Sequence, residues 1–362
     1  MNAIYLRYGG MVTPLGITLA ENFQNMLAGK SGIHKIPESG FQKENWPLSQ
    51  ISNLNPEHRY RDLLAMVCDS LLVNCSPEIL HNDRTLIIVS TTKGDINALP
   101  KDPFASTRKI IADKLKPVHA PLIISNACIS GVLAVGTAAD YIDDGRYDQI
   151  IVIGIDALSD FIVYGFQSLF ALSEEPSKPF DKNRTGISIG EAAGALIVSK
   201  EKSDRGFCTE LLSYSSSNDA NHISGPSRTG EGLVRCVRRT IQRAGIDPNQ
   251  IDFISAHGTG TLYNDDMESI AFDRLELSHV PMNSMKGYFG HTLGAAGVIE
   301  ILATMSMMQN GILLRSPGFE ENGTVKAINV LDEHVEMPIL FALKTASGFG
   351  GGNASLLLKS CK

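Results

Sequence analysis

The segment SNACISG, residues 125–131, holds the residue of this chain that is best placed to act as a nucleophile, Cys128. Its pattern predicts a short apolar strand over 121–125 and a helix over 129–144. A thiol at such a helix start is readily ionised, because the helix dipole and free backbone N–H groups favour the thiolate. The ordinary alternative is a buried, inert cysteine. The position of Cys128 and the two histidines further along the chain favour a reactive cysteine over an inert one.

These histidines also follow predicted strand ends. His257 lies in AHGTGT, residues 256–261, where glycines permit a close approach to a ligand and the hydroxyls of Thr259 and Thr261 can bond a polar chain. His291 lies in KGYFGHTLGAAG, residues 286–297, together with Lys286. Each of these residues also has a structural interpretation. His257 could be a histidine packed in the core, the glycines around His291 could serve a close helix contact, and Lys286 could be a solvated charge.

Asp265 and Glu268 begin the helix that follows His257, where a carboxylate interacts favourably with the helix N-terminus. Near the C-terminus, the glycine-rich turn SGFGGGN (347–353) contains Phe349. The chain has no GxGxxG that opens a helix and no GxxxxGK[ST], so this turn is not interpreted as a phosphate-binding loop. A backbone N–H of this turn could instead form half of an oxyanion hole, with the N–H of Cys128 as the other half. Together these residues suit acyl transfer through a thioester.

The elements that must position these residues alternate between short strands and longer helices, which is typical of βαβ units. Strands are predicted over 85–90, 121–125, 149–155, 193–199, 250–256, 338–344 and 353–359. Helices are predicted over 56–73, 129–144, 230–244, 266–275 and 292–309. The polar stretch 200–206 reads as a linker, so we expect two halves, 1–205 and 206–362. The halves echo each other, which suggests a duplicated, layered α/β architecture with the site between them.

Composition excludes several classes of protein. The chain has 362 residues, 43% hydrophobic and 20% charged, which predicts two packed units of an ordinary globular protein. A net charge of −7 without a basic stripe argues against a nucleic-acid binder. No apolar run is long enough to span a membrane. Six scattered cysteines lack the spacing of a zinc site or a disulfide framework, so we expect no metal and a reducing, cytoplasmic location.

Motifs along the chain resemble those of the elongating β-ketoacyl-acyl-carrier-protein synthases, within the thiolase-like condensing enzymes. Two of them are GGMVTPLG (9–16) and PFDKNRTG (179–186), the latter followed by GEAAG (190–194). The segments around Cys128, His257, Lys286 with His291, and Phe349 also occur in the family's order. The resemblance covers nearly the whole chain and implies a duplicated thiolase-like αβαβα architecture.

The resemblance also implies roles. Cys128 would take the acyl group, and His257 and His291 would assist decarboxylation of a malonyl unit and stabilise the enolate. Lys286 would hold the histidines together with Glu268. The phosphopantetheine arm, arriving on an acyl carrier protein, would contact the two threonines named above. Phe349 would act as a gate, and no further cofactor is implied.

Several departures from the family pattern predict an altered acyl pocket. Little chain lies between residues 94 and 121, Ser347 replaces an aromatic residue, Gly352 replaces a hydroxyl residue, and Leu262-Tyr263 stand where proline is common. We therefore expect a polyene, aryl or polyketide chain in place of bulk fatty acids.

Other readings of the chain differ in testable ways. A thiolase needs a second cysteine in the 347–353 turn, and an initiating synthase has asparagine in place of His291. The alternative from another class is a non-catalytic chain-length partner in a heterodimer, which usually lacks the nucleophile. The expected partners are an acyl carrier protein and a second chain, in a homodimer or a heterodimer with a related chain. Arg108, Lys109 and Lys116 are candidates for a basic patch that binds the acidic carrier.

Overall fold

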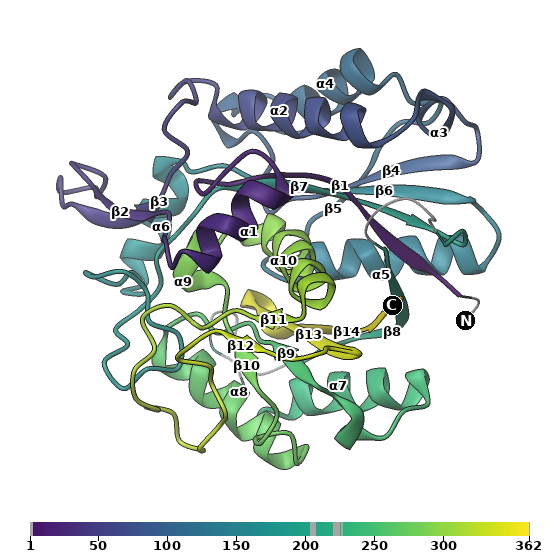
Figure 1. The fold of residues 1–362 in the computed structure, drawn as a ribbon. Coiled ribbons are helices and arrows are strands. Elements are labelled where there is room, and N and C mark those ends of the chain that lie inside the picture. Colours follow the sequence, from purple (N-terminus) through teal and green to yellow (C-terminus); the bar gives the residue numbers. More distant parts are fainter. Residues whose placement is uncertain (1–2, 203–207, 220–224, 226, 362) are drawn as a thin grey trace.

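The protein is described by a computed structural model, which covers residues 3–202, 208–219, 225 and 227–361. Its layers alternate between helices and sheet (Figure 1). Helices α2 (Arg59–Asn74) and α4 (Ala105–Leu115) cover one outer face. Helices α7 (Glu231–Ala244) and α8 (Leu262–Arg274) cover the other, and α5 (Ser130–Asp143) and α10 (Ala296–Asn310) lie between the sheet layers. The layered αβαβα architecture is confirmed.

Strand order repeats in the two halves. The first half contributes β1 (Tyr5–Val12), β4 (Thr85–Ser90), β5 (Leu122–Ile124), β6 (Gln149–Asp156) and β7 (Ala192–Ser199). The second contributes β8 (Cys208–Asn218), β9 (Phe253–Ser255), β10 (Met282–Asn283), β13 (Phe341–Gly348) and β14 (Gly352–Ser360). The orders are β5-β4-β6-β7-β1 and β10-β9-β13-β14-β8, so each half has the same topology.

Pairing directions repeat as well. In each half the three strands farthest from the junction are parallel and the two nearest it are antiparallel. Strands β1 and β8 pair and join the halves. The predicted boundary between residues 205 and 206 lies outside the described residues, so it stays a prediction.

The remaining elements are short. They are α1 (Leu19–Leu27), α3 (Pro77–Leu80), α6 (Asp160–Ser168), α9 (Lys286–Phe289), the pairs β2 (Ile33–Ile36) with β3 (Trp46–Ser49) and β11 (Ile312–Leu313) with β12 (Val335–Glu336), and 3-10 turns at Ile96–Ala98, Pro248–Gln250, Leu293–Ala295 and Phe349–Gly351. Among the described residues no helix is long and apolar enough to cross a membrane.

Burial patterns explain why the central layer forms. Helix α10 is buried along almost its whole length, as expected of a helix with apolar residues on every side. By contrast α7 buries Leu233, Val237 and Ile241 on one face and exposes arginines on the other. Strands β6 and β7 are almost continuously buried, which is typical of strands covered by helices on both faces.

Predicted element bounds differ from the observed ones in instructive places. Strand β8 was not predicted, because its serine-rich sequence hides an alternation of buried and half-buried residues. Helix α10 begins at Ala296 instead of residue 292, because Leu293 has a positive φ of 53° within a 3-10 turn. Helix α8 begins at Leu262, four residues earlier than predicted.

Two glycines allow the central helices to meet. A Cβ built on Gly131 in α5 would lie 2.8 Å from the backbone nitrogen of Val298. A Cβ built on Gly297 in α10 would lie 2.6 Å from the backbone nitrogen of Val132. The starts of α5 and α10 therefore touch backbone to backbone, and this contact brings Cys128 and His291 together.

We expect Gly297→Ala to destabilise the fold by about 1–3 kcal/mol, because backbone atoms must move to admit the methyl group. Gly165→Ala in α6 is the matched control: its Cβ meets no atom within 4 Å, so the fold should gain up to about 1 kcal/mol. Chemical denaturation measures both free energies of unfolding. Equal unfolding midpoints for Gly297→Ala and the wild type would contradict this account of the helix contact.

Candidate active site

Cys128 follows strand β5 and precedes helix α5, as predicted. Ala127, with φ of 44°, turns the chain sharply, and the sulfur lies within the protein at the floor of a cavity. Burial raises the pKa of the thiol to about 12, while Lys286 and a backbone hydrogen bond from Phe349 act in the opposite direction. The prediction of a readily ionised thiol is therefore wrong for the free protein, because desolvation outweighs the helix start.

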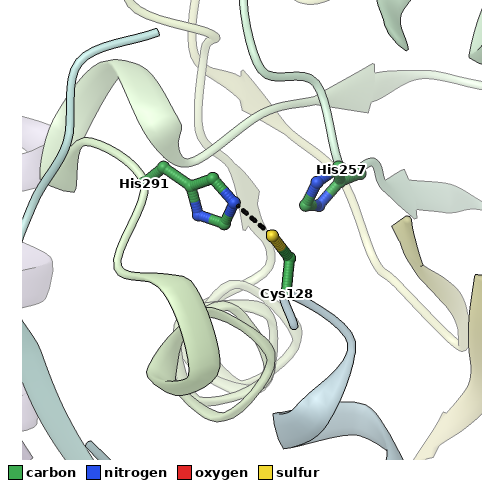
Figure 2. Close-up of side chains that lie close together, drawn as sticks. All are labelled: Cys128, His257 and His291. Atoms are coloured by element: carbon green, nitrogen blue, oxygen red, sulfur yellow. Dashed lines mark hydrogen bonds between the residues drawn. The ribbon is translucent and has the colours of Figure 1, made fainter. Parts of the chain in front are cut away.

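His257 and His291 face this sulfur from two other segments (Figure 2). His291 Nε2 lies 2.9 Å from Cys128 Sγ. The two imidazole rings meet edge to face, with centroids 5.3 Å apart and an interplanar angle of 83°. Both rings are buried. The sequence placed these three side chains at separate strand ends, and the fold brings them together.

Donors fix the tautomer of each imidazole. The Leu293 N–H points at His291 Nδ1 from 3.2 Å, and the Lys286 ammonium lies 3.2 Å from His257 Nδ1. Because each Nδ1 must accept a hydrogen bond, the proton of the neutral ring resides on Nε2. Burial lowers the pKa of both histidines well below 6.5, and Lys286 lowers it further. Both rings are therefore neutral donors at physiological pH.

Cys128, His257 and His291 are also residue types that bind metal ions. Their ligand atoms lie within 4.8 Å of one another. A metal-bound histidine, however, usually donates its second ring N–H to a carbonyl or carboxylate, whereas both second nitrogens here accept hydrogen bonds. The observed partners favour a pair of hydrogen-bond donors over a pair of metal ligands.

Lys286 has a carboxylate partner that was not predicted, Glu300. Its ammonium lies 2.7 Å from Glu300 Oε1 and also donates to the backbone oxygen of His257. Glu268 instead accepts the N–H groups of His257, at 2.9 Å, and of Gly258, at 2.6 Å. Lys286 and Glu268 therefore both hold His257, Lys286 at its ring and backbone oxygen and Glu268 at its backbone N–H, while Glu300 holds Lys286.

Asp265 and Glu268 lie within helix α8 instead of beginning it as predicted, because the helix starts at Leu262. The Asp265 carboxylate accepts the N–H of Phe180 at 2.7 Å and that of Thr259 at 2.9 Å, so it anchors the loop that holds Thr259 and Thr261 to the segment PFDKNRTG (179–186). Burial raises the pKa of Asp265, and it raises the pKa of Glu268 to about 7, with the Asp265 charge adding to the effect.

Sequence reasoning missed Glu300 and Lys344. Both are buried, and Lys344 Nζ lies 2.6 Å from Glu300 Oε2. Burial raises the pKa of Glu300, but the two lysines outweigh this and bring it below its usual range. A signal was present: Glu300 is the one charged residue in the apolar helix sequence AGVIEILATMSMM. A charge in such a helix requires a buried partner.

The cavity above the sulfur has a volume of about 370 Å³. Thr259 and Thr261 line it, with their hydroxyl oxygens 2.9 Å apart. Phe349 also lines it and stacks on Phe166, with ring centroids 5.5 Å apart and an interplanar angle of 21°. Ser347 lines the cavity too, which leaves space where a larger side chain would stand. The cavity thus joins every sequence-predicted site residue that is expected to touch substrate.

The candidate basic patch is largely compensated. Arg108 pairs with Asp102, and Lys109 lies 3.3 Å from Asp113. Lys116 caps helix α4 in a left-handed conformation. Two of the three cations therefore have carboxylate partners, so the structure gives little support for this patch as a carrier-binding surface.

Comparison with known proteins places the chain in a family. The model of the β-ketoacyl synthase N-terminal domain matches residues 116–204, and that of the C-terminal domain matches residues 208–320. The putative mitochondrial 3-oxoacyl-[acyl-carrier-protein] synthase of Schizosaccharomyces pombe is 28% identical over 97% of each chain. The 3-oxoacyl-[acyl-carrier-protein] synthase 2 of Rhizobium meliloti is 34% identical over 69% of this chain and 62% of its own.

Solved structures agree in fold. A chain from the complex of the ketosynthase ApeO with its chain length factor ApeC, from Xenorhabdus doucetiae, superposes with a TM-score of 0.89 at 26% identity, covering 99% of this chain and 98% of its own. A β-ketoacyl synthase from Burkholderia phymatum gives a TM-score of 0.90 at 22% identity, over all of both chains, and shows the fold alone. The likeness therefore extends over both halves, and this chain belongs to the β-ketoacyl synthase family.

Proposed function

We propose that the protein is an elongating condensing enzyme, which joins a cysteine-bound acyl group to a malonyl unit carried by an acyl carrier protein. The observation that carries this proposal is the pair of neutral imidazoles with their Nε2–H groups beside Cys128 Sγ. Two donors aimed at one point can stabilise the oxygen of a thioester carbonyl as it becomes an enolate. Because the imidazoles are uncharged, they do not hold the malonyl carboxylate in place.

The first half-reaction loads the enzyme. Cys128 sulfur bonds to the acyl carbon, the bond from that carbon to the phosphopantetheine sulfur breaks, and the thiol proton passes to the leaving sulfur. The Phe349 N–H already points at the cysteine, so it and the Cys128 N–H are placed to hold the tetrahedral oxyanion. The high thiol pKa means that deprotonation must accompany attack, with the surrounding N–H groups stabilising the sulfur.

The second half-reaction makes the carbon–carbon bond. The malonyl carbon–carboxylate bond breaks, CO₂ leaves, and the electron pair forms an enolate whose oxygen accepts the Nε2–H groups of His257 and His291. The enolate carbon then attacks the acyl carbon and Cys128 leaves as a thiolate. Losing one such donor typically lowers the rate by about 10²–10³-fold. Thr259 and Thr261, on the cavity wall, would bond the phosphopantetheine arm, and no other cofactor enters this scheme.

The chain-length partner reading is the alternative. ApeO and the ishigamide ketosynthase are both described with a chain length factor, so a heterodimer is a real possibility for this fold. The complete and ordered set of Cys128, His257 and His291 favours the catalytic role, because a shape-giving subunit has no need of a nucleophile with two donors.

The acyl pocket favours a flat chain. Phe166 and Phe349 present stacked rings at the cavity, and aromatic faces bind planar conjugated groups well. Ser347, which bonds Asn353 at 2.8 Å, opens room nearby. We therefore infer a polyene, aryl or polyketide substrate, in keeping with the departures in the sequence. The six unpaired cysteines fit a reducing compartment such as the cytoplasm.

Strand β5 is the proposed subunit contact. It ends one side of the sheet, its residues Leu122–Ile124 are only half-buried, and its free edge can pair with a second chain. We expect sedimentation to give a particle of about twice the 39.1 kDa chain mass. A monomer that carries out the complete condensation would contradict the subunit contact without affecting the proposed chemistry.

We expect wild-type protein to gain the mass of one acyl group when it is incubated with acyl-carrier thioesters, and Cys128→Ala to gain none. Intact-protein mass spectrometry measures the adduct, and a panel of saturated and conjugated chains identifies the substrate class. Adding malonyl-carrier protein should discharge the adduct as a β-ketoacyl product. Absence of an adduct from every donor would favour the chain-length partner, and preference for saturated chains would refute the substrate class.

We expect the rate of malonyl decarboxylation to fall on the acid side only below pH 6.5; this fall is the acid limb of the pH profile. The folded-state pKa of both imidazoles is lowered, so they stay neutral as the pH falls past 6.5 and become protonated only below it. Cys128→Ala isolates this step by removing the thiol, and CO₂ release measures it. Glu268, with a pKa of about 7, also titrates, so Glu268→Gln is the control. A limb at or above pH 6.5 that persists in Glu268→Gln would contradict neutral imidazoles.

A further inference from the structure

Lys344 is a buried amine that takes no direct part in the proposed reaction. It lies in strand β13, its side chain is fully buried, and its Nζ has only oxygen partners. Besides Glu300 Oε2 at 2.6 Å, these are the backbone oxygens of Thr345 at 2.6 Å, Ser255 at 3.1 Å and Ala256 at 3.4 Å. An isolated buried ammonium is strongly destabilising, so this oxygen cage is a specific site for a positive charge.

Glu300 links Lys344 to the reactive histidines. One carboxylate oxygen contacts Lys286 and the other contacts Lys344, so the carboxylate lies between two ammonium groups. Lys286 in turn lies 3.2 Å from His257 Nδ1 and donates to the His257 backbone oxygen. A chain of direct contacts therefore runs from Lys344 through Glu300 and Lys286 to His257.

Counting charges shows what the second lysine changes. Two ammonium groups and one carboxylate give the group of Lys286, Glu300 and Lys344 a net charge of one positive unit. Without Lys344, the remaining lysine and Glu300 would cancel. The positive charge of Lys344 adds to that of Lys286 in lowering the pKa of both histidines. Glu268 and Asp265 from helix α8 and the Cys128 thiol also face this cluster, and Thr345 Oγ1 lies 3.3 Å from Glu268.

We propose that Lys344 is a positioning residue for the condensation: by occupying the second oxygen of Glu300, it keeps Lys286 on His257 Nδ1 and leaves an excess positive charge beside both imidazoles. The proposal rests on the proposed function for its kinetic consequence. Its structural content is independent of that function, since the tautomer and charge of the imidazoles can be observed without turnover.

Lys344→Met tests the electrostatic part, because it fills the site with an uncharged chain of similar length. Acylation of Cys128 should remain within about 3-fold of wild type, because its oxyanion is held by the backbone N–H groups of Cys128 and Phe349, which Lys344 does not contact. The condensation rate should fall about 10- to 100-fold, the range expected when a catalytic group is displaced slightly. The acid limb of decarboxylation should move to higher pH, because the pKa of the imidazoles rises when the excess charge is lost.

A second variant distinguishes charge from packing. Lys344→Met combined with Glu300→Gln removes one charge of each sign, so the excess returns to one positive charge on Lys286. The acid limb should then return toward its wild-type pH, and the two substitutions should be non-additive. The Glu300 carboxylate still pairs with Lys286 at 2.7 Å in the single variant, and in the double variant the amide oxygen introduced by Glu300→Gln can still accept a hydrogen bond from Lys286.

Rescue tests the oxygen cage directly. Lys344→Ala leaves a space bounded by three backbone oxygens and a carboxylate, so added ammonium chloride should restore part of the condensation rate, and tetramethylammonium chloride should not. Lys359→Met is the matched control, since Lys359 is partly exposed on neighbouring β14 and 3.7 Å from Glu210. It should keep the wild-type rate and pH profile.

Nitrogen NMR of the histidine side chains gives the readout that needs no activity. Wild type should show the Nε2–H tautomer for both rings, and Lys344→Met should show protonation of His257 at higher pH. A folded Lys344→Met protein with wild-type NMR titration and pH profile would overturn the proposal. Wild type with the expected tautomers but no condensation would refute the proposed function and leave only the effect of Lys344 on the tautomer and pKa of the imidazoles.

Discussion

The backbone contact between Gly131 and Gly297 is the constraint on which the site depends. It allows the starts of α5 and α10, one from each half of the duplicated fold, to lie closer than any side chain would permit. Cys128 precedes one of these helices and His291 precedes the other. The 2.9 Å approach of His291 Nε2 to the sulfur therefore follows from main-chain geometry as much as from the two side chains. Neither half could form this site alone.

Electrostatics then determines what the assembled groups can do. Burial disfavours the charged form of Cys128, His257 and His291. It raises the pKa of the thiol and lowers the pKa of both imidazoles. The charges that do occur lie one layer behind, on Lys286, Glu300 and Lys344, where each has partners of the opposite sign. This separation gives a surface of neutral donors facing the substrate, supported by fixed charges that substrate does not touch. Such a preoriented environment stabilises developing negative charge without reorganising.

Much of this could be predicted from the sequence. The apolar strands that end at Ser90 and Ile124 and the glycine-rich segments near Cys128 and His291 are local patterns, and local patterns report secondary structure well. The partner of Lys286 could not be obtained in this way. Glu300 lies 14 residues beyond Lys286 in the sequence, but the two side chains become neighbours only after α9 and α10 pack. Strand β8 was not predicted, because its serine-rich sequence shows only a weak alternation of hydrophobic and polar residues.

Lys344 shows why a buried charge is the hardest feature to infer from sequence. In the strand sequence FALKTASG it reads as an exposed lysine on an edge, because lysine is almost never fully buried. Its burial becomes reasonable only when β13 is seen to pair with β9, which brings the carbonyl oxygens of Ser255 and Ala256 to its amine. Strand β9 leads directly into His257. The same pairing that solvates Lys344 thus fixes the backbone of the histidine that it influences, so the stability of the buried amine and the geometry of the imidazole have a common structural origin.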